Sequence, residues 1–133
     1  MRNRIYPTLS GGERARVQFA RVLAQLWERD ADHARYLLLD EPTASLVLAH
    51  QHDCLRAARD FAAGGTGVLV VLHDPNLALA YSDDVTVLRD GGVLASGATA
   101  ATLTGEILSS AYGIQVHIHQ LQEAGHPVIW THP

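Results

Sequence analysis

Apolar residues near the start of the chain recur with the period of a helix. After the pair Gly11-Gly12, one helical stripe is formed by Ala15, Phe19, Val22 and Leu26. Such spacing is typical of an amphipathic helix with one buried face. Ser10 and Glu13, three residues apart, form the pattern of a capping box. The sequence therefore predicts a helix that begins at the glycine pair.

Two short, continuous apolar runs predict strands. The first spans residues 36–39 and is stopped by Asp40-Glu41-Pro42, and the second spans residues 68–72 and is stopped by His73-Asp74-Pro75. Runs without alternation indicate strands that are buried on both faces. A helix over about residues 47–62, ended by Gly64-Gly65, separates them. This order predicts parallel pairing, with helices on both faces of the sheet.

The remaining pattern predicts a short helix over residues 76–81 and then a hairpin. Its strands, residues 85–88 and 93–95, flank the turn sequence Asp90-Gly91-Gly92. Beyond Ala98 the chain predicts small helices, a strand near residues 114–118 and a weakly patterned tail. The fold class is therefore predicted to be α/β.

Composition narrows the functional classes. The 133 residues are 47% hydrophobic and 18% charged, as expected for one globular domain. No apolar run approaches the roughly 18 to 20 residues of a membrane helix. Ten basic and fourteen acidic residues give a net charge of -4, which argues against nucleic-acid binding. The first residues lack an apolar signal core, and Cys54 is the single cysteine, so we expect a reduced, cytoplasmic compartment.

All ten basic residues are arginines, so the chain contains no lysine. A P-loop of the form GxxxxGK[ST], which needs a lysine, is therefore absent from these residues.

The polar residues at the element ends suggest phosphate chemistry. Backbone N–H groups at a glycine-rich helix start can bind an anion, although an ordinary capped helix start has the same sequence. Asp40 could hold Mg²⁺ through its water shell, and Glu41 could orient or deprotonate an attacking water. His73 could bind a terminal phosphate or that water. Alone, the acidic pair is more commonly solvated at a strand end, and the histidine is more commonly a hydrogen-bonded residue at a strand edge. Their order along the chain makes the functional interpretation stronger.

In this order the motifs resemble those of the ATP-binding subunits of ABC transporters. Residues 9–13, Leu-Ser-Gly-Gly-Glu, resemble the signature motif, and residues 36–43 resemble Walker B with its catalytic glutamate. Residues 71–74 resemble the switch-histidine loop. The D-loop position is occupied by Ala44, Ser45, Leu46 and Val47. The resemblance extends from about Tyr6 to His119 and is strongest to the iron-chelate and hemin importer branch.

The resemblance implies a partial P-loop NTPase domain, a parallel sheet with flanking helices that lacks its Walker A half. It implies that Glu41 and His73 are catalytic and that Asp40 holds Mg²⁺ through water. The cofactor would be Mg-ATP. The partners would be a second ATP-binding subunit, in a head-to-tail dimer, and an integral membrane permease, with the chain peripheral on the cytoplasmic face of the inner membrane. ATP held by the partner subunit would be covered by the signature residues Ser10, Gly11, Gly12 and Glu13.

The resemblance divides residues 1–133, taken as the C-terminal part of one ATP-binding domain, into three segments. These are a signature helix (9–28), a Walker B to switch-histidine region (35–82), and closing strands with a tail (84–133). In this fold the P-loop strand lies between the switch-histidine strand and the strand at residues 85–88, so its absence would leave two unpaired edges.

Two departures limit the expected activity. Without a P-loop lysine and its backbone donors, the main stabilisation of a triphosphate is missing, so we do not expect hydrolysis by this chain alone. Val47 stands where the family's D-loop normally ends in aspartate, and valine can accept no hydrogen bond across a dimer. A tolerated loop substitution is the alternative interpretation of Val47.

Two other functions stay open at this point. An ABC-type ATPase of DNA repair or chromosome maintenance shares the signature and Walker B, but such proteins insert a long coiled coil. The second is that the chain is a non-enzymatic remnant that only pairs with an intact subunit. A metal site at the histidine pairs 50/52 and 117/119 is disfavoured, because no cysteine or carboxylate cluster joins them. Cys54 is expected to be a buried apolar residue.

Overall fold

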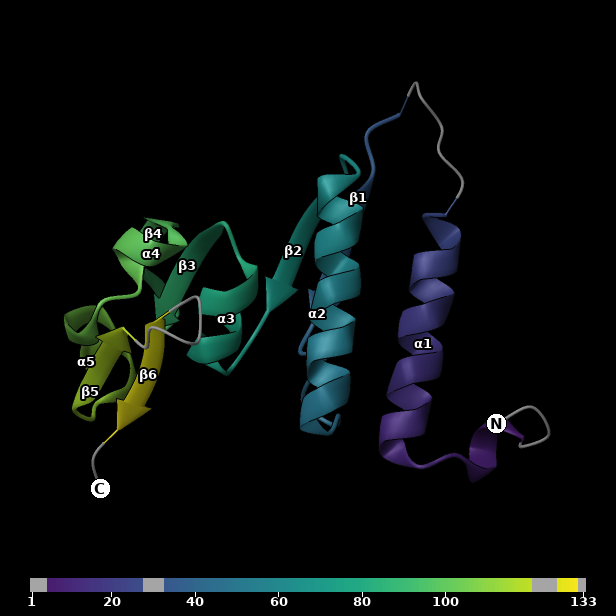
Figure 1. Cartoon of the computed structure of the whole chain (residues 1–133), viewed down its shortest axis with the longest axis horizontal. Coiled ribbons are helices and arrows are strands. Elements are labelled where there is room, and N and C mark those ends of the chain that lie inside the picture. The colour runs from purple at the N-terminus through teal and green to yellow at the C-terminus, as the bar shows by residue number, and fades with distance from the viewer. Residues whose placement is uncertain (1–4, 28–32, 121–126, 132–133) are drawn as a thin grey trace. The chain divides into compact units, whose positions relative to one another are not determined.

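The computed structural model describes residues 5–27, 33–120 and 127–131 of the chain. The chain divides into two compact units, residues 1–73 and 74–133, which are described separately. Figure 1 gives the order of the elements.

The first unit contains one parallel strand pair and two long helices. Its elements are the 3-10 helix η1 (Tyr6–Thr8), α1 (Gly11–Gln25), β1 (Tyr36–Asp40), α2 (Leu48–Ala63) and β2 (Gly67–Val71). β1 and β2 pair in parallel over their whole length, from Tyr36 opposite Gly67 to Asp40 opposite Val71. Both predicted helices, both strands and their parallel pairing are confirmed.

The start of α1 follows from its capping box. The Ser10 hydroxyl accepts a hydrogen bond from the Glu13 N–H at 3.3 Å, and the Glu13 carboxylate accepts one from the Ser10 N–H at 2.8 Å. Two N–H groups that lack helical acceptors are thereby satisfied. The apolar stripe of α1 packs on a core of Leu37, Leu39 and Ala58. The residues of α1 and its end that contact this core are Phe19, Val22, Leu23 and Leu26.

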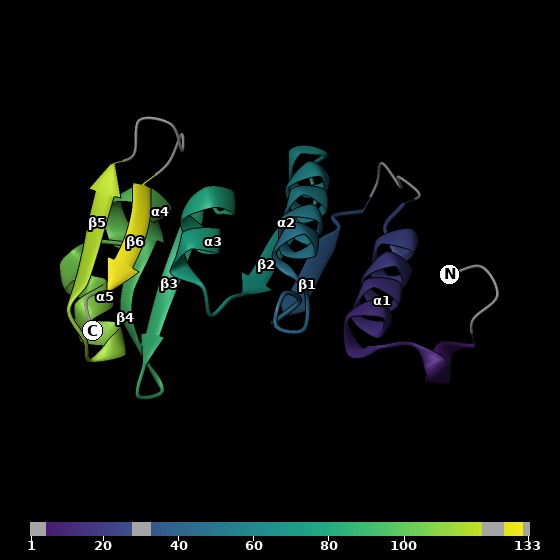
Figure 2. The same cartoon turned by 60° about the horizontal axis from the view of Figure 1, so that its bottom comes forward.

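The expectation that both strands are buried on both faces is wrong. Leu37 and Leu39 are buried, but the alternate residue Leu38 is 70% exposed, and Leu69 of β2 is 64% exposed. The reason is that helices cover one face of the pair: α2 lies against β1 and β2 in both views (Figure 1, Figure 2), and α1 packs on the same core. The second face, predicted to carry helices too, is open within the described residues of this unit.

The second unit combines a short helix with two antiparallel hairpins. Its elements are α3 (Pro75–Tyr81), β3 (Asp84–Arg89), β4 (Gly92–Ala98), α4 (Thr99–Thr102), α5 (Gly105–Tyr112), β5 (Val116–Gln120) and β6 (Pro127–Thr131). β3 pairs with β4, and β5 pairs with β6. Asp90 and Gly91 form the first hairpin's turn with φ of 50° and 76°, a conformation typical of such Asp-Gly turns. Among the described residues, β2 pairs with β1 alone and β3 with β4 alone.

β6 lies in the tail that the sequence pattern left without an element. Its backbone is held by Asn76 of α3, whose side-chain oxygen accepts from the Ile129 N–H at 2.7 Å. The side-chain nitrogen of Asn76 donates to the Ile129 carbonyl at 3.2 Å. Asp74 caps α3 by accepting from the Asn76 N–H at 2.8 Å, so the capped start of α3 also holds the strand.

Candidate functional site

The ends of β1 and β2 bring together two of the residues predicted to act in catalysis. Because the strands are parallel and in register, their carboxyl ends meet at one edge, where Asp40 lies opposite Val71. The chain leaves β1 through Glu41, which has a φ of 44°, an uncommon value for a residue other than glycine. The Glu41 carboxylate lies 2.6 Å from Nε2 of His73. Both side chains remain accessible to solvent.

Asp40 lies beside this pair as the last residue of β1 and is exposed. An accessible carboxylate at a strand end is compatible with Mg²⁺, which prefers oxygen ligands and keeps several of its waters. In the part of the chain that the structure describes, no group of three His, Cys, Asp or Glu side chains surrounds a metal position. The donor set therefore fits a hydrated Mg²⁺ that is also bound by phosphate oxygens, rather than an ion enclosed by protein.

The two glycines of the signature segment differ in what surrounds them. A Cβ on Gly12 would lie 3.0 Å from the Ser45 carbonyl oxygen, so a larger residue there makes a tight contact that the loop must relieve by shifting. A Cβ on Gly11 would meet nothing within 4 Å. Gly11 is exposed, so its surroundings leave room for an anion near the start of α1, where the helix dipole favours negative charge.

The D-loop segment is folded back on itself and anchored to α2. The Ala44 N–H donates to the Glu41 carbonyl at 3.2 Å. The Gln51 side chain donates to the carbonyls of Thr43 and Leu46 at 3.3 and 3.1 Å. Through Gly12 and Ser45 the signature helix touches this loop, so two predicted motifs that are more than 30 residues apart in the sequence are in contact.

Val47 occupies the N-cap position of α2. Its backbone has the extended geometry of a cap, with φ of -69° and ψ of 154°, but its side chain caps no N–H group. Val47 is 67% exposed. Aspartate is among the preferred residues at this position, so the residue that the family pattern favours is also the one that a helix start favours.

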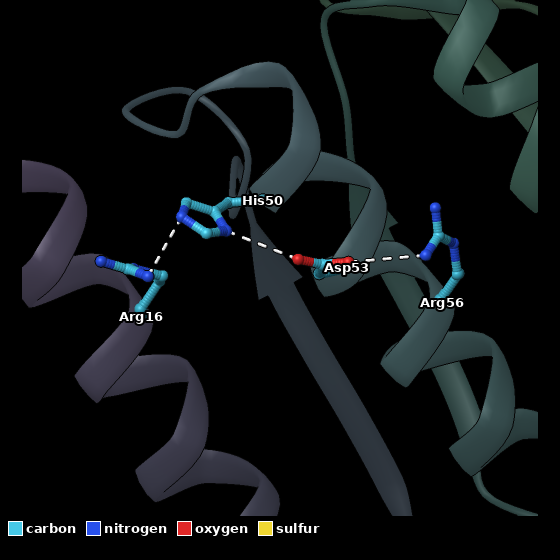
Figure 3. A network of polar contacts seen from close by, with 4 residues as sticks. All are labelled: Arg16, His50, Asp53 and Arg56. Carbon is cyan, nitrogen blue, oxygen red and sulfur yellow. Dashed lines mark hydrogen bonds and ion pairs between the residues drawn. The ribbon is translucent and has the colours of Figure 1, made fainter.

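A polar network missed by the sequence analysis joins α1 to α2 (Figure 3). Arg16 Nη1 lies 3.1 Å from Nε2 of His50, whose Nδ1 lies 3.4 Å from the Asp53 carboxylate, and Arg56 also contacts Asp53 at 3.5 Å. Since arginine can only donate, Nε2 of His50 is the acceptor and Nδ1 carries the proton. The sequence feature that could have indicated part of this network is the i,i+3 spacing of His50 and Asp53 on one helix.

The network borders a small cavity in the first unit. The cavity has a volume of about 280 Å³ and is lined by Arg16, Phe19, Leu46, His50, Asp53 and Cys54. Cys54 is buried, as expected from the sequence, and burial raises the pKa of its thiol from 9.0 to about 11. A thiol in this state is a poor nucleophile.

Comparison with known proteins identifies the fold and the relatives. No family model matches the sequence. The hemin import ATP-binding protein HmuV of Gloeobacter violaceus is 52% identical over 126 residues, which cover 95% of this chain and 46% of that protein. HmuV of Myxococcus xanthus is 51% identical over 96% of this chain and 48% of its own length. A metal-chelate type ABC transporter in an inward-facing conformation matches with a TM-score of 0.83 and 27% identity, covering 98% of this chain and 50% of that chain.

The fold is that of part of an ABC ATPase domain. A nucleotide-free ATP-binding cassette from an ABC transporter, 23% identical with a TM-score of 0.56, agrees in fold. The chain spans about half the length of the curated relatives it matches. In the described parts of the chain, no helix is long and apolar enough to cross a membrane.

Proposed function

We propose that the chain provides the signature and Walker B part of an ABC importer ATPase for hemin or an iron chelate. The observation that carries this proposal is the contact of Glu41 with His73 at the carboxyl ends of two parallel strands. A carboxylate held by an imidazole at this edge can orient or deprotonate a water that attacks a phosphoryl group. The names of the relatives support the substrate class.

Asp40 would bind Mg²⁺ through water, and Gly11 would expose helix N–H groups to the phosphates of an ATP held by a partner subunit. Bound Mg²⁺ neutralises charge on the phosphate oxygens in such reactions. These 133 residues contain no lysine and therefore no P-loop. The triphosphate on which Asp40, Glu41 and His73 act must be held by a P-loop outside these residues.

The partners follow from the same proposal. The ATPase would form a head-to-tail dimer with another ATP-binding subunit and attach to an integral membrane permease at the cytoplasmic face of the inner membrane. The net charge of -4 gives no support for nucleic acid as a partner.

A chimera tests the proposed chemistry. Residues 1–133 replace the matching segment of HmuV from Gloeobacter violaceus, and Mg-dependent ATP hydrolysis is measured. We expect activity in the chimera and a loss of at least about 100-fold in E41Q, because a general base contributes at least that much. E106Q, which changes an exposed glutamate at the start of α5, is the matched control and should remain active. A folded, dimeric chimera in which E41Q hydrolyses ATP as fast as its parent contradicts the proposal.

A non-enzymatic remnant is the second candidate, favoured by the missing lysine and by Val47. The chimera experiment distinguishes this candidate from the importer ATPase by one outcome. If the folded chimera binds ATP and pairs with an intact subunit but neither it nor V47D hydrolyses ATP, this segment acts by pairing alone.

A further inference from the structure

The β5–β6 hairpin carries two imidazoles and an indole on one face. His117 and His119 are two residues apart on β5, and alternate residues of a strand project from the same side. Trp130 of β6 lies directly opposite His117 in the register. Its ring stacks on His117 with centroids 5.1 Å apart and lies 5.7 Å from the ring of His119. The three rings therefore form one cluster.

The imidazole nitrogens of His117 and His119 are available to a ligand as far as the described residues show. Within the described residues no hydrogen bond or ion pair engages His117 or His119, whereas His50 and His73 bind Arg16 and Glu41. His117 is half-buried and His119 is exposed, so solvent reaches the cluster. Neutral imidazole nitrogen is a good ligand for Zn²⁺, Cu²⁺ and Ni²⁺.

The strand geometry suits chelation. Two residues along a strand span about 6.6 to 6.8 Å. From this separation two side chains on one face can direct nitrogens to a single ion at about 2.0 to 2.1 Å each. Contact with Trp130 restricts the rotamers of both histidines, which lowers the entropy lost on binding.

Against the expectation from the sequence, and because of this shared face and its contact with Trp130, we propose that His117 and His119 together bind one divalent transition-metal ion, with Trp130 as a positioning residue. Water completes the coordination, because no third His, Cys, Asp or Glu side chain joins them among the described residues. With two imidazole ligands the affinity follows the general order for nitrogen sites, in which Cu²⁺ binds more tightly than Ni²⁺ or Zn²⁺.

The chain has a matched control. His50 and His52 have the same spacing of two, but they lie on helix α2, where residues two apart point in different directions. His50 also contacts Arg16 and Asp53. The pair on α2 is therefore not expected to chelate.

Fluorescence of Trp130 under Cu²⁺ titration tests the proposal on the full chain. The chain contains two tryptophans, and Trp27 is 77% exposed, so W27F leaves Trp130 as the single reporter at little structural cost. At pH 7.5 we expect saturable quenching with one ion per chain. H117Q and H119Q should each weaken the apparent affinity by at least about tenfold, since even loss of an outer-shell partner has an effect of this size. H52Q should leave the affinity unchanged.

Several outcomes overturn the proposal. One is that H117Q and H119Q bind Cu²⁺ as tightly as the W27F parent. Another is that the urea-unfolded chain binds as tightly as the folded chain. The third is that affinity is lost only in the double variant H126Q/H132Q, whose positions lie outside the described residues. Far-UV circular dichroism establishes that each variant is folded. If a variant does not fold, the electron paramagnetic resonance spectrum of Cu²⁺ on the W27F chain decides: two coordinated imidazole nitrogens support the site, and one or none refutes it.

Discussion

Replacing Val47 with aspartate is expected to stabilise the chain by completing the start of α2. Val47 already has the backbone conformation of an N-cap, but it offers no acceptor to the N–H groups of the first turn. The first turn of α2 also contains no acidic residue. An aspartate at this position supplies both the missing hydrogen bond and a negative charge at the positive end of the helix dipole.

The magnitude follows from these two effects. An N-cap side chain contributes about 0.5 to 2 kcal/mol relative to a residue that cannot cap. Its charge adds about 0.3 to 1 kcal/mol at low ionic strength. Val47 is 67% exposed, so its removal sacrifices little apolar burial. We therefore expect V47D to raise the free energy of unfolding by about 1 to 2 kcal/mol and V47N by about 1 kcal/mol.

Urea unfolding followed by circular dichroism measures the effect, with V47A as the reference that neither caps nor carries charge. With a slope of about 1 to 3 kcal/mol per molar urea, a change of 1 kcal/mol moves the midpoint by several tenths molar. High salt should reduce the advantage of V47D but leave that of V47N unchanged, because only the charge is screened. If V47D and V47N unfold at the same urea concentration as V47A, the assignment of Val47 as an uncapped N-cap is refuted.

Three further predictions concern the two glycines of α1, Asn76 and Cys54, and the first two are measured by the same unfolding assay. G11A should raise stability by about 0.5 to 1 kcal/mol through helix propensity. G12A should be less stable than G11A, because its methyl group makes a tight contact with the Ser45 carbonyl oxygen; equal stability of the two variants contradicts this. N76A should cost about 2 kcal/mol, for two hydrogen bonds to Ile129. An N76A variant as stable as its parent contradicts these two contacts. The Cys54 thiol, whose pKa burial raises from 9.0 to about 11, should react slowly with a disulfide reagent at pH 8 until the chain unfolds. Its contribution to the free energy of unfolding should be complete below pH 9 and lost as the pH rises through 11. Rapid reaction of the folded chain contradicts the burial of Cys54.

The parts of the fold that depend on local chemistry could be predicted from the sequence. The Ser10 and Glu13 spacing located the start of α1 because a capping box acts within four residues. The contact of Glu41 with His73 was not itself predicted. It follows, however, from parallel pairing, since two strands that each end in a polar residue bring those residues to one edge.

The parts that depend on distant partners could not be predicted. The residues of β6 show no alternation, and their position depends on Asn76, 53 residues earlier in the chain. The contact of Arg16 with His50 depends on how two helices pack, which the amphipathic pattern of either helix leaves undetermined. A glycine's role is similarly non-local: Gly11 and Gly12 are equivalent in sequence, and only the position of Ser45 distinguishes them.

The open face of the β1–β2 pair explains why the burial prediction was wrong, and it agrees with the greater length of the relatives. A strand with one solvated face normally alternates apolar and polar residues. These strands do not alternate: their exposed positions are occupied by Tyr36, Leu38, Leu69 and Val71. The sequence is thus that of strands covered on both sides, and the HmuV proteins and the metal-chelate transporter chain that match it are about twice as long. We infer that residues beyond the described part of this unit cover the apolar face, and that the P-loop required by the proposed chemistry lies outside these 133 residues. The exposed apolar face and the missing lysine both agree with a chain that spans about half the length of the relatives it matches.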